Sequence, residues 1–598
     1  MSLPPGPVYI LQNLPYVVGP PAAALIAAKL LPLASVELPT WAIILGSILS
    51  LPVAWFLQIQ YRDFVDQRAA AAHGAVLPPK IHSKWPGGLD VLKRFLANLS
   101  SGYPGDLFVE FTKEYGHTFN FRILFENRFF TTEPEYIKAI LASQFDNFEK
   151  GPALNDQNKH ILGTGVFNSD GDMWKFHRAM TRPFFSKDRI SHFDIFDRRA
   201  TEALRQLKLR LREGYPVDIQ DLASRFTMDS ATEFLFNTDV RSLDAGLPYP
   251  HYSPLVNTSA VDHPANQFSR AFDEAQRFIA LRGRRGINWP LSEFWKDEVK
   301  EKMVIVRGFI DPIIKTAVER KRASGVSEKS SSEKDREVKE GESLLDHLIN
   351  YTEDQTVLRD EVLNILLAGR DTTTNSITFA TYMLAEHPDV FERLRQEVLD
   401  KVGETRRPTF EDMKDMKYLR AVINETLRLY PAVPFNIRST NKPVVLPGKY
   451  GNLPFYLPPN SKAPYSVFMM HRRKDLWGPD ADVFDPDRFL DTRLKKYLTP
   501  NPFIFLPFNA GPRICLGQQF AYHETSFFLI RLLQQFSGIT HVYEAQPSPA
   551  GRPLASWKGA EGPKGRDKLR LKTYLTMSAN GGCWVKLEEA QVQNNVSV

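Results

Sequence analysis

One cysteine near the C-terminal end of the chain has neighbours that would help it to bind a metal. The segment PFNAGPRICLGQQ, residues 507–519, contains Cys515, and the whole chain has only two cysteines. A thiolate is a soft ligand that suits iron, but it needs help to stay deprotonated. Gly511 and Gly517 allow a tight turn that brings amide N–H groups to the sulfur, and a helix beginning at Gly517 favours negative charge there. If the iron belongs to a larger cofactor, Arg513 can pair with an anionic group on that cofactor. This setting predicts an iron-binding thiolate, whereas a cysteine without it is more often an ordinary buried thiol.

Phe508 extends this segment to the full pattern F-x-x-G-x-R-x-C-x-G. The pattern resembles the haem-binding signature of cytochrome P450 enzymes, and every position of the signature is matched. The resemblance implies that Cys515 binds the iron of haem b, iron protoporphyrin IX. It also implies the cytochrome P450 fold, which is mainly α with a small β region, preceded here by an N-terminal transmembrane helix.

A second pattern, E-x-x-R, occurs as Glu425 and Arg428 in NETLRLYP. On a helix the two side chains lie on one face and can form an ion pair. Apolar residues flank them on several sides, so we expect the pair to be buried, and a buried pair needs further hydrogen-bonding partners. Arg488 in FDPDRF supplies one and completes what resembles the family's Glu-Arg-Arg triad. The resemblance implies that this triad has a structural role beneath the cysteine loop.

The segment LLAGRDTTTNSITFATYMLAEHP, residues 366–388, belongs to a predicted helix of roughly thirty residues, about 45 Å long. A capping residue, Thr352 or Asp354, bounds this helix at one end and Pro388 bounds it at the other. Its middle is locally unfavourable, because glycine and threonine are poor helix formers and hydroxyl groups compete for backbone carbonyls. Such a local violation often marks a functional site.

The unfavourable stretch matches every position of the family's A/G-G-x-D/E-T-T/S motif, with Ala368, Gly369, Arg370, Asp371, Thr372 and Thr373. By resemblance, the helix opens here to admit O2 and water over the iron. Thr372 then hydrogen-bonds the oxygen to be activated, and Asp371 helps to deliver protons for O–O cleavage. A kinked core helix without a catalytic role is the alternative interpretation.

Trp174 and Arg178 in GDMWKFHRAMTRPFF fit the family's W-x-x-x-R pattern, in which both residues reach a haem propionate. The indole N–H and the guanidinium are both donors, as a carboxylate requires. Arg438, after YPAVPFNI, resembles a further propionate-binding position. The order of these residues along the chain supports the assignment more than either pattern does alone.

The sequence around the motifs resembles fungal alkane and fatty-acid hydroxylases and related broad-range fungal monooxygenases. We therefore expect an apolar substrate, with terminal or near-terminal hydroxylation of long chains as the first hypothesis and aromatic hydrocarbons as a further one. The candidates for the substrate pocket are Val166, Phe167, Ala368, Val433, Phe435 and the stretch LTMSANGG, residues 575–582.

The resemblance implies a monooxygenase that inserts one atom of O2 into its substrate. The sequence contains no Gly-rich phosphate fingerprint and no flavin or nicotinamide module, so electrons must come from another protein. The resemblance implies an NADPH–cytochrome P450 reductase in the same membrane, with cytochrome b5 as a further candidate. Lys175, Arg182 and Arg513 are predicted to form a basic docking face, with scattered solvated charge as the alternative.

Two other functions are compatible with a bound haem. One is a haem-thiolate isomerase or dehydratase that acts on peroxides without O2 or a reductase, and the pair Asp371 and Thr372 counts against it. The other is a non-catalytic haem-binding membrane protein, which would not consume NADPH in the presence of a reductase. The intact acid–alcohol pair also argues against this second alternative.

The N-terminal region predicts a membrane anchor. Trp41–Leu57 carries no charge, and its length is close to that needed to cross a hydrocarbon core, although a buried core helix is the alternative. Upstream, Pro20–Ala34 is shorter and contains Lys29, so we expect it at the membrane interface, with a second span left open. Several lysines and arginines follow Leu57, which places the catalytic body in the cytosol. The prediction is a single-pass protein of the endoplasmic reticulum membrane.

Composition limits the remaining function classes. The net charge of +6 is small for 598 residues and does not suggest nucleic-acid binding. Two cysteines cannot form a disulfide framework, which favours a reducing compartment. Short β-like runs are predicted at residues 117–124 and 127–133, and irregular inserts at 323–343 and 546–566. The predicted organisation is an N-terminal segment 1–40, an anchor 41–57, a linker 58–88 and a haem-binding catalytic domain 89–598.

Overall fold

Helices make up most of the computed structural model, which describes residues 3–30, 38–185, 193–256, 263–323, 338, 341–449 and 451–591, with the backbone alone at 99–100. The helices are α1 Pro5–Leu30, α2 Thr40–Ala72, α3 Leu89–Ser101, α4 Asp106–Tyr115, α5 Pro134–Lys138, α6 Pro152–Leu162, α7 Gly171–Thr181, α8 Asp194–Arg212, α9 Ile219–Phe236, α10 Pro264–Arg285, α11 Glu298–Ala323, α12 Leu344–Ile349, α13 Gln355–Glu386, α14 Pro388–Lys401, α15 Phe410–Asp415, α16 Lys417–Leu429, α17 Val467–Met470, α18 Lys474–Trp477, α19 Gln518–Gln535 and α20 Pro563–Arg566.

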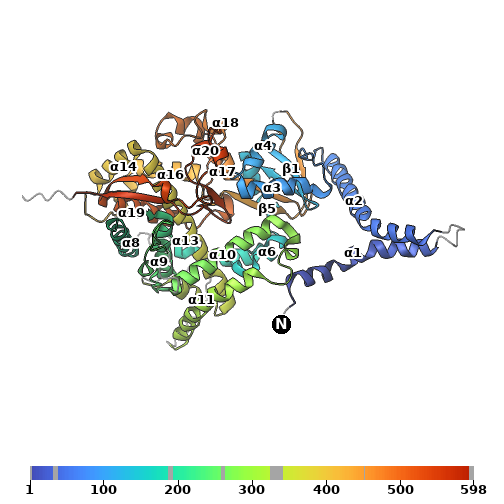
Figure 1. The fold of residues 1–598 in the computed structure, drawn as a ribbon, viewed down its shortest axis with the longest axis horizontal. Helices are drawn as coiled ribbons and strands as arrows, with labels where there is room; N and C mark the ends of the chain where they lie inside the picture. The colour runs from blue at the N-terminus through green and yellow to red at the C-terminus, as the bar shows by residue number, and fades with distance from the viewer. Residues whose placement is uncertain are drawn as a thin grey trace, which may run out of the picture.

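Short strands form small sheets beside the helices. The strands are β1 Thr118–Ile123, β2 Glu126–Thr131, β3 Phe148–Glu149, β4 Val217–Asp218, β5 Phe435–Thr440, β6 Val444–Leu446, β7 Phe455–Leu457, β8 Lys462–Ser466, β9 Phe536–His541, β10 Leu571–Thr573, β11 Met577–Ala579 and β12 Trp584–Glu589. The largest sheet has the order β1-β2-β8-β5-β3, and it lies on the side of the body next to α2 (Figure 1). The mainly helical fold and both predicted β runs are confirmed.

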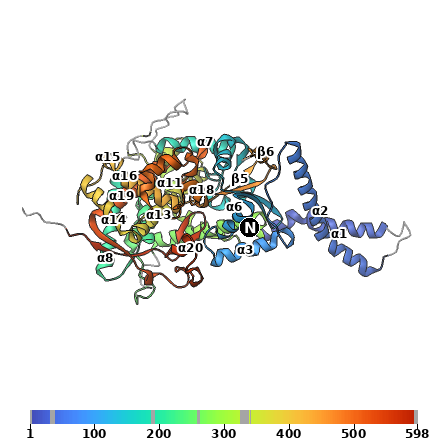
Figure 2. The same cartoon turned by 90° about the horizontal axis from the view of Figure 1, so that it is seen from above.

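Helix α13 is the central element of the body. It begins where Asp354 accepts hydrogen bonds from the N–H groups of Thr356 and Val357, and it ends before Pro388, as the sequence predicts. Most of its side chains are buried on all sides, and it packs against α9, α11, α16 and α19. A helix that is apolar around much of its circumference must lie in a core, and Figures 1 and 2 show α13 enclosed in this way.

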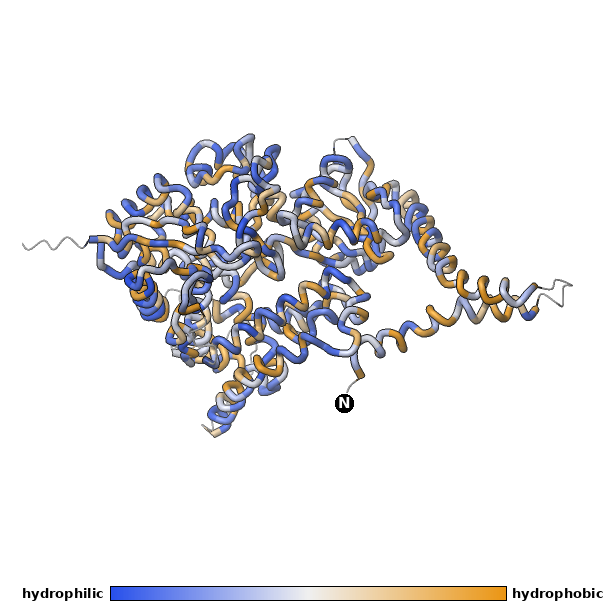
Figure 3. Tube along the Cα trace, in the orientation of Figure 1, coloured by the Kyte–Doolittle hydropathy of each residue, from blue (hydrophilic) through white to orange (hydrophobic). Residues whose placement is uncertain are grey.

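Two N-terminal helices project from the body and approach each other at their outer ends (Figures 1 and 2). Both are long and apolar enough to cross a membrane, and hydrophobic residues recur along both (Figure 3). Helix α2 extends beyond the predicted anchor into the predicted linker, because no helix breaker occurs between Leu57 and Gly74. Helix α1 begins well before the predicted interfacial stretch and contains three prolines, which membrane helices tolerate.

The two predicted inserts have different outcomes. The insert at 323–343 lies largely outside the described residues. The insert at 546–566 lies against the body, because Trp557 is buried with its ring centroid 5.9 Å from that of Tyr103. Just after the insert, the carboxyl group of Asp567 accepts hydrogen bonds of 2.7 Å from the hydroxyls of Tyr103 and Tyr430. This segment is therefore an integral part of the fold.

Candidate functional site

The loop that carries Cys515 is held in a tight turn before α19. The N–H of Cys515 donates to the carbonyl of Phe508 across 3.1 Å. Gly511 has a φ of +69°, and a Cβ at this position would lie 1.8 Å from the carbonyl oxygen of Leu141. Any other residue would therefore both strain the backbone and collide with it. This close approach explains why the pattern requires glycine at residue 511.

The sulfur of Cys515 lies in an enclosed but accessible position. Burial raises the pKa of its thiol, while the Gly517 N–H and the nearby Arg178 guanidinium act to lower that pKa. Cys515 is nevertheless exposed. The two observations describe a sulfur that has protein around it but is not fully covered by side chains. Such a position fits a thiolate that is covered by a bound group.

The middle of α13 is less tightly packed than its flanks. Ala368, Gly369, Asp371 and Thr372 are only partly buried, whereas the preceding turns are fully buried. Thr372 Oγ1 donates to the carbonyl of Ala368 across 2.6 Å. The helix is continuous at this position, so the opening implied by the resemblance is not present. A threonine hydroxyl bonded to the carbonyl four residues earlier is compatible with an intact helix and often bends it.

Four basic side chains gather around the cysteine loop. Arg178 donates to the carbonyl of Ile514 across 3.0 Å, and the Arg513 guanidinium lies 4.5 Å from the ring centroid of Trp174. Arg438 is buried, and it donates to the carbonyl of the preceding residue, Ile437, across 2.8 Å. The fourth is Lys150, whose pKa lies well below its usual range because it is buried and because Arg438 and Arg513 are close.

Asp170 is the carboxylate that pairs directly with this group, through a 2.8 Å ion pair with Arg513. Three guanidinium groups (Arg178, Arg438 and Arg513) and one paired carboxylate leave an excess of positive charge in a partly buried region, which is costly without a further anion. The carboxylates of a haem would supply that anion, and the residues therefore fit this cofactor. Trp174 is also buried, and its indole N–H can serve as a further donor.

The Glu-Arg-Arg set comes together as the sequence predicts. Glu425 binds Arg428 through two hydrogen bonds of 2.7 Å, and both side chains are fully buried. Arg428 also donates to the carbonyls of His471, Ala481 and Val483. Arg488 Nε lies 3.6 Å from Glu425 Oε1. These contacts tie α16 to the segment that precedes the cysteine loop.

The predicted pocket residues come from segments that converge near α13. The N–H groups of Val166 and Phe167 donate to side chains of α13. The Met577 N–H, in the predicted stretch 575–582, donates to the carbonyl of Ala432, and Asn375 of α13 donates to the Met577 carbonyl. Val433 and Phe435, which follow Ala432, are partly buried. Each of these segments is thus linked to α13 or to a neighbour of it.

Two of the three residues of the predicted basic docking face lie at the surface, and the third does not. Lys175 and Arg182 are exposed, but the Arg513 side chain is 9% exposed and pairs with Asp170. Arg513 therefore cannot contact a protein partner at the surface. Burial beside Asp170 is the reason for this difference from the prediction.

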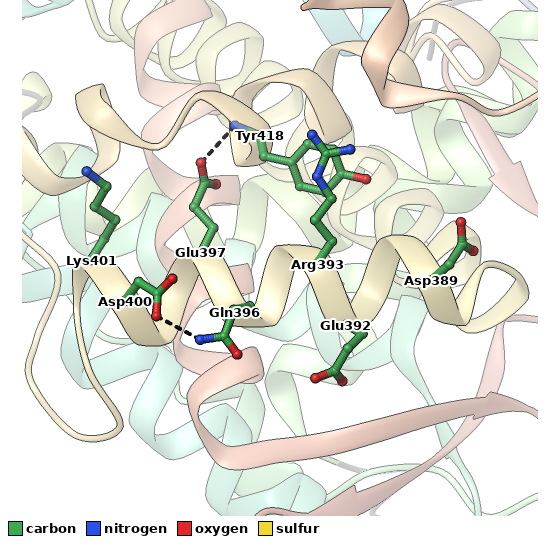
Figure 4. A pocket seen from close by; sticks show the side chains of 8 residues that line it. All are labelled: Asp389, Glu392, Arg393, Gln396, Glu397, Asp400, Lys401 and Tyr418. Carbon is green, nitrogen blue, oxygen red and sulfur yellow. Dashed lines mark hydrogen bonds between the residues drawn. The ribbon is translucent and has the colours of Figure 1, made fainter.

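A hollow on the outer face of α14 is separate from these residues (Figure 4). Charged side chains line it, and Glu397 accepts hydrogen bonds from the N–H groups of Tyr418 and Leu419 at the start of α16. None of its lining residues belongs to the four sequence motifs. Its polar lining and its capping contacts indicate a structural groove.

Sequence reasoning missed several charged or polar groups near the motifs. Asp273 and Gln276 of α10 lie beside Asp371, whose pKa burial raises to about 6. Burial also raises the pKa of Glu524, on α19, to about 8, and the nearby hydroxyls of Thr373 and Ser230 oppose that shift. Neither α10 residue belongs to a sequence motif. For Glu524, the one available signal in the sequence was its place on the helix that follows Cys515.

Comparison with known proteins agrees with this geometry. A family model described as "Cytochrome P450" matches residues 87–555. The chain is 35% identical over 505 residues to a Fusarium protein named "Cytochrome P450 monooxygenase g430", covering 82% of this chain and 85% of the relative. It is 38% identical to "Cytochrome P450 52A3-A" of Candida maltosa, covering 70% of this chain and 77% of the relative. For "Cytochrome P450 52A9" of the same yeast, the identity is 35% and the coverage is 84% and 89%.

Proposed function

The chain belongs to the cytochrome P450 family of monooxygenases, and from this premise we propose that it hydroxylates a long apolar substrate with electrons from a separate NADPH-dependent reductase. The reaction would be RH + O2 + two electrons + two protons giving ROH and water. The family implies a haem-iron cofactor, which supplies the bond chemistry when bound. The observation that carries the proposal is the accessible but desolvated sulfur of Cys515 within a complete haem-binding signature.

We assign the binding of this cofactor to two groups of residues. Cys515 would ligate the iron as a thiolate, favoured by the Gly517 N–H and by Arg178. Trp174, Arg178 and Arg438 would hold the propionates, and these anions would favour the charged form of the nearby Lys150. Arg513 would act less directly, because it is already paired with Asp170. The excess of positive charge supports this assignment.

An apolar substrate is supported by the resemblance to fungal alkane and fatty-acid hydroxylases and by the aliphatic and aromatic pocket candidates. A spectral binding screen with alkanes, fatty acids, aromatics and sterols tests the substrate class. Long-chain alkanes or fatty acids are expected to shift the Soret band at the lowest concentrations. A response to sterols alone would contradict the proposal. Turnover with a peroxide substrate, without O2 or reductase, would instead favour the isomerase or dehydratase alternative.

Thr372→Ala is expected to retain haem and to consume NADPH but to release much of the reducing power as hydrogen peroxide. A positioned proton-transfer group contributes about 10²–10⁴-fold, so hydroxylated product per NADPH should fall by about 10-fold or more. Product and peroxide are measured together with reductase present. Thr374→Ala is the matched control, because Thr374 makes the same type of bond to the carbonyl four residues earlier. Unchanged coupling in Thr372→Ala would remove this hydroxyl from the mechanism.

We further propose that α1 and α2 form a hairpin in the membrane, with the N-terminus on the cytosolic side. The Gly6 N–H donates to the carbonyl of Phe294 across 3.0 Å, and the Tyr9 hydroxyl donates to Asn288 across 2.6 Å. At the far end of α2, Asp63 pairs with Arg122 of β1. The catalytic domain thus holds both ends of the hairpin, which favours the two-span alternative over a single pass.

An epitope tag before Met1 is expected to be cleaved by protease added to sealed microsomes, to the same extent as a tag after Val598. Detergent-treated microsomes provide the control for full access. A variant without residues 1–57 should associate less with the membrane fraction, because it lacks α1 and the apolar half of α2. Protection of the N-terminal tag alone would support a single pass instead.

The redox partner and the domain boundaries are also part of the proposal. Exposed Lys175 and Arg182 suit an acidic reductase surface, with cytochrome b5 as a second candidate.

The family match begins at residue 87, which supports a catalytic domain from about residue 89 onward. The endoplasmic reticulum is the membrane expected for such a pair of proteins.

A further inference from the structure

Arg370 lies between two carboxylates and contacts them unequally. Its Nη1 is 2.8 Å from Asp273 Oδ1 on α10 and 3.5 Å from Asp371 Oδ1, its neighbour in the chain. Its Nη2 donates to Ser224 of α9 across 3.0 Å. Successive residues on a helix point about 100° apart, so Arg370 does not face Asp371 by default. The contacts with α9 and α10 hold the guanidinium in its position.

The difference in distance affects the acidity of Asp371. A cation within about 4–6 Å normally lowers the pKa of a carboxyl group by one to three units. At Asp371, burial is the largest influence and raises the pKa to about 6, while Arg370 lowers it and Asp273 raises it. Asp273 therefore acts twice, because it binds the arginine and also adds its own negative charge.

The other charged and polar groups around Asp371 do not replace Asp273. On α10, Gln276 donates a hydrogen bond to Asp371 and favours its charged form. On α9, Asp221 interacts with Arg370 only at longer range. Among the described residues, Asp273 is the carboxylate in direct contact with the guanidinium other than Asp371 itself.

We propose that Asp273 is a positioning residue for proton delivery: it holds Arg370 against α10 and so leaves Asp371 able to take up and release a proton. This inference rests on the proposed monooxygenase function, in which Asp371 is the acid. Without Asp273, Arg370 would turn to the nearest remaining carboxylate, which is Asp371. A tight Asp371–Arg370 pair would keep the acid deprotonated at neutral pH.

The test compares Asp273→Asn with wild type in the full-length holoenzyme with reductase, as product formed per NADPH across pH 5 to 8. The pH at which coupling falls by half is expected to drop by about one unit in Asp273→Asn. Glu274→Gln is the matched control, because Glu274 is the next residue on α10 and pairs with Lys302 at the surface. A profile for Asp273→Asn that coincides with the Glu274→Gln profile would overturn the proposal.

The double variant Asp273→Asn/Arg370→Met separates positioning from a general loss of structure. If Arg370 mediates the effect, removing it should cancel the downward shift in pH, although the contacts of Arg370 with Asp273 on α10 and Ser224 on α9 are then both gone. A shift that persists in the double variant contradicts the proposal.

Thermal unfolding provides a readout apart from turnover. The raised pKa of Asp371 makes the folded state bind its proton more tightly, so stability is lost as pH rises from about 4 to 6. This loss should be smaller in Asp273→Asn than in Glu274→Gln, and equal losses would count against the proposal. Asp371→Asn tests the premise that Asp371 delivers protons. Unaltered coupling in that variant would refute this role of Asp371, whereas the Asp273→Asn profile tests the effect of the Asp273–Arg370 contact.

Discussion

Cys515→Ser is expected to abolish the red-shifted Soret band of the reduced CO complex and to reduce hydroxylation to background. A serine hydroxyl is far less acidic than a thiol, so it cannot provide the soft anionic ligand that the iron requires. The surrounding turn should survive, because the two side chains are similar in size. The measurement is a reduced CO difference spectrum of the full-length protein, together with haem content.

Cys583→Ala is the matched control, because it removes the second of the two cysteines. Cys583 is fully buried, and burial together with nearby Asp218 raises the pKa of its thiol well above the usual range. It is therefore a neutral packing residue, and its loss should leave the Soret band in place. An unchanged band in Cys515→Ser, or a lost band in Cys583→Ala, would disprove the assignment of the ligand.

Local signals explain which parts of the fold the sequence could predict. Helix α13 begins at Asp354 and ends before Pro388 as expected, because a side-chain cap and a proline act within a few residues. The strands β1 and β2 follow from short alternating runs with a turn between them. The Cys515 loop was predictable because its signature is dense and contiguous.

Contacts between distant segments explain what the sequence could not predict. Lys150 and Asp273 belong to no motif, and they reach the site only because the fold brings β3 and α10 beside it. The buried position of Arg513 depends on Asp170, which is 343 residues earlier in the chain. The start of α1 lies beside Phe294, and hydropathy carries no information about that contact. The residue types were enough to predict the chemistry of the site. Which basic side chain pairs with which carboxylate depends on tertiary packing, and the sequence does not reveal it.

Glu425→Gln is expected to lower the free energy of unfolding by about 3–5 kcal/mol, because it leaves Arg428 charged and fully buried without its carboxylate. Arg488 keeps its 3.0 Å ion pair with Asp480. Arg428 would keep its three carbonyl acceptors, but these dipoles only partly offset the desolvation of a full charge. Urea unfolding monitored by fluorescence measures the change, and haem content shows whether the cysteine loop is disturbed.

The chain contains a control with the same spacing and distance but different burial. Glu202 and Arg205 on α8 also form an E-x-x-R pair at 2.7 Å, with side chains 29% and 56% exposed. Water already solvates this second pair, so Glu202→Gln should cost only about 0–1 kcal/mol. If the two variants lost equal stability, the sequence pattern itself would determine the energy of the pair. A large difference would show that burial determines it, and that the core beneath the cysteine loop gains stability from the Glu425–Arg428 pair.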